Sequence, residues 1–68
     1  MIKVYISDAL QVITEKIDNN DIETANKMLA VVSAGIARQR SKKQNPRIIE
    51  LNSKKEITYF QRVVIVDN

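Results

Sequence analysis

Cysteine and histidine are both absent from this 68-residue chain. Without cysteine there is no disulfide framework, no thiolate zinc site and no cysteine nucleophile. Without histidine there is no histidine-ligated metal and no Ser-His-Asp triad. The remaining acids, amines and hydroxyls form no pair at a catalytic spacing. We therefore expect no enzymatic activity, no metal and no bound cofactor.

Glycine and proline occur once each, and the aromatic residues are two Tyr and one Phe. The chain contains no repeat, low-complexity segment or linker, and 44% of its residues are apolar, too many for a disordered tail. Its longest uncharged run is the ten residues 28–37, whereas a membrane span needs about twenty. No signal peptide pattern is visible at residues 1–20. We expect one small domain over residues 1–68, soluble in the cytoplasm and without membrane contact.

Charge is distributed unevenly along the chain. The net charge is +3, but residues 1–24 carry −3 and residues 25–66 carry +7. Five cations and no acid lie between Arg38 and Arg47. This asymmetry is typical of proteins with an anionic partner, nucleic acid above all.

The hydrophobic periodicity of the first half predicts a strand followed by two helices. Apolar and polar residues alternate over residues 2–6, as in a half-buried strand. Residues 9–18 have helical periodicity, with Ser7 or Asp8 as the expected N-cap.

We expect the second helix to start at Asn20 or Asp21, with Asn20 as its cap, and to end at residues 44–46 before the proline restriction. Its residues 29–37 are apolar or small on every side, which indicates burial on more than one side. We interpret Gly35 as a point of close helix–helix approach.

The last third of the sequence predicts a β-hairpin. Residues 47–51 form a short strand, residues 52–56 a polar turn and residues 57–66 a long strand of β-branched and aromatic residues. The predicted fold class is therefore α+β, in the order β-α-α-β-β, with two helices packed on one face of a small three-stranded sheet. One short chain cannot cover all of this apolar surface, so we expect a homodimer to complete the fold.

The basic residues are the leading candidates for a functional site, because cations neutralise phosphates. Gln39, Gln44 and Asn45 lie among them and are side chains of the kind that reads adenine. The candidate nucleic-acid-binding residues are Arg38, Arg40, Lys42, Lys43, Arg47, Lys54 and Lys55.

Other side chains extend or compete with this interpretation. Lys54, Lys55 and Arg62 would extend the basic surface if the hairpin folds beside the end of the second helix. Tyr5 or Tyr59 would stack on bases if exposed. The acids at residues 18, 21 and 23 do not follow the EF-hand pattern and are better explained by helix capping.

Two function classes follow. The first is a small dimeric nucleic-acid-binding regulator, such as a transcription factor, that uses the basic helix end and the hairpin. The second is a compact inhibitor or adaptor, of the kind that phages encode, that docks on a larger acidic protein. A third interpretation assigns the cations no partner, because cations also suit the negative end of a helix dipole.

In its order of elements, the segment 1–40 resembles the ribbon-helix-helix repressors. That resemblance implies a first strand paired with its copy in a dimer, with Lys3, Tyr5 and Ser7 facing the bases. The predicted hairpin over residues 47–66 has no place in that minimal fold.

Overall fold

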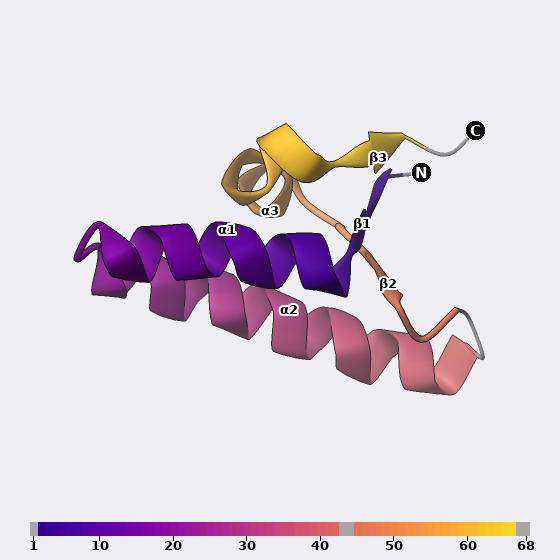
Figure 1. Ribbon diagram of the computed structural model, residues 1–68. Helices are drawn as coiled ribbons and strands as arrows, with labels where there is room; N and C mark the ends of the chain where they lie inside the picture. Colours follow the sequence, from indigo (N-terminus) through magenta and orange to yellow (C-terminus); the bar gives the residue numbers. More distant parts are fainter. Residues whose placement is uncertain (1, 43–44, 67–68) are drawn as a thin grey trace.

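The computed structural model describes residues 2–42 and 45–66. Two long helices run antiparallel and side by side, and the strands cross one end of the pair (Figure 1). The α+β class and the packing of the helices on an antiparallel sheet are confirmed. The elements are β1 (Ile2–Tyr5), α1 (Ile6–Asp18), α2 (Ile22–Lys42), β2 (Ile48–Glu50), α3 (Lys54–Tyr59), the 3-10 helix η1 (Gln61–Val63) and β3 (Ile65–Val66).

The strand β1 is flanked on both sides by strands of its own chain. It pairs antiparallel with β2, so that Val4 lies opposite Ile49 and Lys3 opposite Glu50. On its other side it pairs with the two-residue β3, where Ile65 lies opposite Lys3. The pairing with β3 covers Ile2 and Lys3, and the pairing with β2 covers Lys3 to Tyr5. The ribbon-helix-helix resemblance implies pairing of the first strand with its own copy, whereas β1 here pairs with β2 and β3 of the same chain.

The helix α1 begins directly after β1, and neither Ser7 nor Asp8 caps it as predicted. Tyr5 occupies the cap position and forms no side-chain cap bond. The backbone N–H of Ile6 instead donates to the carbonyl oxygen of Arg47 at 2.9 Å. A carbonyl from a distant segment thus satisfies one of the free N–H groups of the first turn, which a local cap would otherwise have to do.

The turn between α1 and α2 is fixed by one left-handed residue. Asn20 has a φ of 63°, a conformation that asparagine tolerates better than most residues. The N–H groups of Asn20 and Asp21 donate to the carbonyls of Ile17 and Lys16, the two bonds of a Schellman motif. Asn20 therefore ends α1 and does not cap α2. Asp21 caps α2 instead, since its Oδ1 accepts from the N–H of Thr24 at 3.4 Å.

Residues 54–59 and 61–63 of the predicted hairpin are helical, so the polar turn over residues 52–56 and the long strand over residues 57–66 are wrong, and of that strand Ile65–Val66 are extended. Ser53 caps α3 by accepting from the N–H of Glu56 at 3.2 Å. The carboxylate of Glu56 accepts in return from the N–H of Asn52 at 2.9 Å. The spacing of Ile57 and Phe60 then places both side chains toward the core. Local capping and burial together outweigh the β propensity of this segment.

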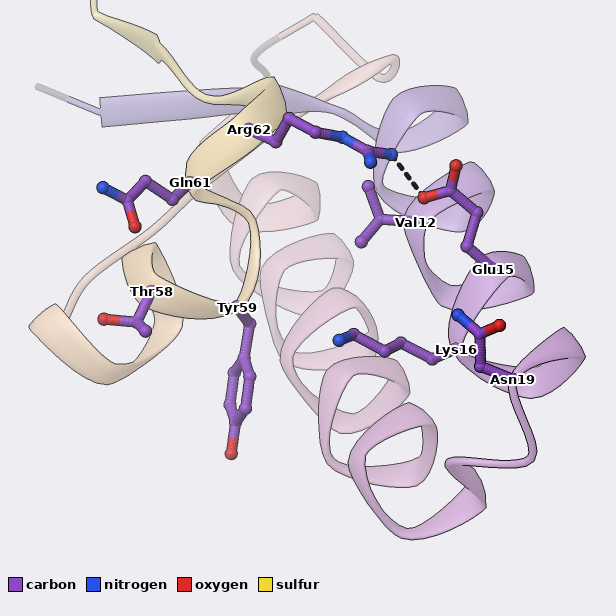
Figure 2. A pocket seen from close by; sticks show the side chains of 8 residues that line it. All are labelled: Val12, Glu15, Lys16, Asn19, Thr58, Tyr59, Gln61 and Arg62. Atoms are coloured by element: carbon purple, nitrogen blue, oxygen red, sulfur yellow. Dashed lines mark hydrogen bonds and ion pairs between the residues drawn. The ribbon is translucent and has the colours of Figure 1, made fainter.

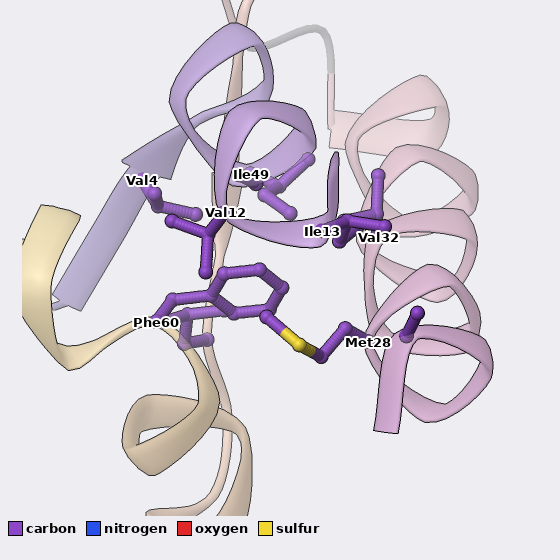
Figure 3. Close-up of a cluster of buried hydrophobic side chains, with 10 residues drawn as sticks. Val4, Val12, Ile13, Met28, Val32, Ile49 and Phe60 are labelled. Carbon is purple, nitrogen blue, oxygen red and sulfur yellow. The ribbon is translucent and has the colours of Figure 1, made fainter. Parts of the chain in front are cut away.

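The core lies between the helix pair, the sheet and α3. Phe60 is fully buried, with Val12 of α1 beside its ring and Met28 of α2 reaching toward it (Figure 3). Gly35 allows α2 to lie close to β2, because a Cβ at this position would lie 2.8 Å from the Cβ of Ile49. The close approach is thus between α2 and β2 and not between two helices. The buried apolar residues are Val4, Ala9, Val12, Ile13, Ala25, Met28, Val32, Ile49, Leu51 and Phe60.

Candidate nucleic-acid interface

Arg38 is held by the fold on the inner side of α2. Its Nη2 donates to the carbonyl oxygen of Glu50 at 2.9 Å, and it lies 3.7 Å from Oε1 of Glu56. One guanidinium therefore joins α2 to β2 and to the start of α3. Only 31% of its side chain is exposed. These contacts give Arg38 a structural role, and the nucleic-acid contact expected from the sequence stays a prediction.

The predicted base-reading amides are also used within the chain. Gln39 is buried, and its Nε2 donates to the carbonyl oxygen of Ile48 at 2.7 Å. Asn45 is exposed, but its Oδ1 accepts from the N–H of Arg47 at 3.0 Å and so shapes the turn before β2. Gln44 lies outside the described residues. These bonds assign Gln39 to the interior and Asn45 to the turn.

Arg40 and Arg47 are the exposed members of the basic run whose side chains the structure describes. The last turns of α2 and the turn before β2 lie at the same end of the molecule (Figure 1). Lys42 is the last residue of α2, and Lys43 lies outside the described residues. This end therefore retains part of the predicted basic surface.

An exposed aromatic ring lies at this same end. Tyr5, which is 42% exposed, borders an open hollow together with Arg47, Pro46 and the first residues of α1, Ile6 and Ser7. Tyr5 and Arg47 come from segments about forty residues apart, and the bond from Ile6 N–H to the Arg47 carbonyl fixes them together. A cation beside an exposed ring suits a phosphate and a stacked base. The sequence contained both residues but gave no sign that they are neighbours.

Lys54 and Lys55 lie in the first turn of α3. Lys55 borders a different hollow with Lys27 and Ala30, near the middle of α2. Because an α-helix rises about 1.5 Å per residue, Lys27 and Ala30 lie about 15 Å or more from Arg40 along α2. The basic residues thus lie in two groups at different levels along α2, which the contact of Arg38 with Glu56 of α3 connects.

A further hollow separates α1 from α3 and η1 (Figure 2). Arg62, expected to extend the basic surface, instead forms an ion pair with Glu15 across this hollow. Lys16 reaches from α1 toward Tyr59, which also borders the space (Figure 2). Sequence reasoning missed this hollow, because it depends on α3 being a helix. The charge of Arg62 is matched here by Glu15, so this arrangement provides no strong site for an anion.

Within residues 2–42 and 45–66, no three acidic side chains come together as metal ligands. None of the helices in the same ranges combines the length and apolarity needed to cross a bilayer.

Comparison with known proteins adds no relative: no protein-family model, no curated protein and no solved structure matches the chain.

Proposed function

We propose that this protein is a small non-enzymatic nucleic-acid-binding regulator that contacts its ligand through the end of the molecule bearing Arg40, Arg47 and Tyr5. The observation that carries the proposal is the shared hollow of Tyr5 and Arg47 at the end of the chain's basic run. Phosphates bind the guanidinium groups, while an unpaired base stacks on the exposed ring of Tyr5. Single-stranded nucleic acid is therefore the favoured ligand.

The test is fluorescence anisotropy with mixed-sequence single-stranded and duplex oligonucleotides at about 50 and about 200 mM salt. Contacts with about four phosphates should lower the affinity roughly a hundredfold across this range. Arg47→Ala should weaken binding roughly five- to tenfold and reduce the salt slope by about one. Tyr5→Ala should weaken single-stranded binding roughly tenfold and duplex binding much less.

Lys54→Ala is the matched control, because it removes the same charge from an exposed residue in the other basic group. It should leave the affinity within about twofold of the parent. Equal effects of Arg47→Ala and Lys54→Ala would show that net charge alone acts and would contradict the proposed interface. No binding at low salt would sink the nucleic-acid function.

We also propose that the protein acts as a homodimer. Support comes from large apolar side chains that remain exposed on α1 and α2. The same exposure supports the second function class, in which the chain docks as an inhibitor or adaptor on a larger acidic protein. The oligomeric state of the purified protein distinguishes the homodimer from the docking module. A homodimer forms in the purified protein, whereas a docking module stays monomeric.

A further inference from the structure

The two long helices carry exposed apolar side chains at seven-residue intervals. On α2 these are Ile22, Leu29 and Ile36, and on α1 they are Leu10 and Ile17. Each of the five is between 37 and 47% exposed. A seven-residue repeat of this kind is typical of the seam of a helical bundle. We call these five residues the apolar helix face.

Helical periodicity places the five residues on one side of the helix pair. On α2, Lys27 and Val31 border α3, and the buried Met28 and Val32 lie next around the helix. Leu29 lies beyond them, on the flank away from α3. On α1, Val12 and Glu15 border the hollow toward α3, so Leu10 and Ile17 lie on the opposite flank. The apolar helix face is therefore open on the side that α3 does not cover.

The two ends of this face carry opposite charges. Arg40 continues the line of Ile22, Leu29 and Ile36 along α2, since it lies four residues beyond Ile36 and is exposed. The other end is the turn between the helices, which carries Asp18 and Asp21. From Ile22 to Ile36 the face is about 21 Å long.

We propose that this face binds a second copy of the chain in antiparallel orientation, with the two-fold axis passing beside Leu29. Leu29 then lies opposite Leu29 of the second copy, and Ile22 lies opposite its Ile36. The helices of the two copies form a four-helix bundle with one isologous interface. This inference deepens the proposed dimeric state and does not depend on nucleic acid.

Charge complementarity selects the second copy and its orientation. An antiparallel pair places each Arg40 beside the acidic turn of the other copy, where Asp18 and Asp21 lie. A parallel pair would place Arg40 beside Arg40 and one acidic turn beside the other. Exposed ion pairs contribute little affinity, but like charges in contact oppose the wrong arrangement. The apolar residues thus provide the affinity and the end charges set the direction.

The absence of native cysteine makes disulfide trapping a direct test. Under mild oxidation without nucleic acid, Leu29→Cys should cross-link with itself. Ile22→Cys and Ile36→Cys should each stay uncross-linked alone but cross-link when mixed, because a disulfide needs Cα atoms about 4.4 to 6.8 Å apart. Thr58→Cys, exposed on α3 outside the face, is the control and should not cross-link.

Sedimentation of the uncross-linked protein tests the affinity of the same interface. Leu29→Glu should raise the dimer dissociation constant roughly a hundredfold or more, because the change occurs twice in a two-fold interface. Gln61→Glu adds the same charge outside the face and should leave it unchanged. Arg40→Glu should weaken the dimer, and adding Asp18→Lys to it should restore the affinity.

Two outcomes would overturn the proposed dimer. Self-cross-linking of Ile22→Cys would show a parallel arrangement. A parent protein that stays monomeric at every concentration would show that a different protein covers the face. Unchanged nucleic-acid binding in Arg47→Ala together with the expected cross-linking would contradict the proposed ligand site and leave the dimer standing, so the two failures are distinguishable.

Discussion

Arg38 and Arg40 are two residues apart and are equivalent in any count of charge, yet the fold gives them different roles. Arg38 faces β2 and α3, where it donates to the carbonyl of Glu50, while Arg40 is exposed. Gln39, which lies between them, is buried and donates to the carbonyl oxygen of Ile48. Direction around a helix, which changes by about 100° per residue, decides which member of a basic run reaches solvent.

At the residue scale, Arg38→Ala should lower the free energy of unfolding by about 1 to 3 kcal/mol, because a charge-assisted hydrogen bond to a strand carbonyl is lost. Arg47→Ala removes the same charge from an exposed side chain and should change stability by less than about 0.5 kcal/mol. Urea unfolding followed by circular dichroism measures both. Equal stability of the two variants would contradict the structural role of Arg38.

At the scale of the element, two signals in the sequence of α3 conflict. The capping motif favours a helix, whereas the β-branched and aromatic residues favour a strand. Its six residues are too few for a helix that is stable alone. The sequence Ser53-Lys54-Lys55-Glu56 has the spacing of a capping box, and Ser53 caps the N–H of Glu56 while the carboxylate of Glu56 accepts from the N–H of Asn52, one residue before the cap. This motif was the signal in the sequence that could have identified α3. The β-branched and aromatic residues that follow it concealed the helix.

Ser53→Ala should destabilise the protein by about 1 kcal/mol, because the N–H of Glu56 loses its acceptor. Ser53→Asp retains an acceptor at the cap and should stay within about 0.5 kcal/mol of the parent. Thermal unfolding of the three proteins side by side provides the comparison. If the aspartate variant lost as much stability as the alanine variant, the cap would not be what holds α3.

At the scale of the whole molecule, charge and apolar surface are arranged along one long axis. The chain measures 35 by 21 by 19 Å, and α1 and α2 extend along its length (Figure 1). The acidic turn between the helices lies at one end and the basic end of α2 at the other. The charge asymmetry of the sequence thereby becomes a difference between two ends in space.

The proposed dimer predicts that Tm depends on protein concentration. Because dimerisation stabilises the folded state by mass action, the Tm of the parent should rise by roughly 5 to 10 °C over a hundredfold increase in concentration. Leu29→Glu should show a Tm independent of concentration, and Gln61→Glu should behave as the parent does. A scanning calorimetry series tests this, and a flat parent series would argue against self-association.

Features that depend on neighbouring residues could be predicted from the amino-acid sequence alone. Periodicity predicts the first strand, the two helices and the second strand. The restriction that proline imposes predicts that the second helix ends before Pro46. The absence of Cys and His likewise excludes thiolate and imidazole chemistry, whatever the fold. These are local properties, so composition and spacing were sufficient to predict them.

Tertiary structure decided the features that depend on contacts between distant segments. Burial of Phe60 between Val12 and Met28 favours the helical form of α3 over a strand. The carbonyls of β2 accept hydrogen bonds from Arg38 and Gln39, and the carbonyl of Arg47 brings this residue beside Tyr5. Periodicity gives each side chain a direction relative to its own element only, whereas a binding surface depends on how the elements are placed together.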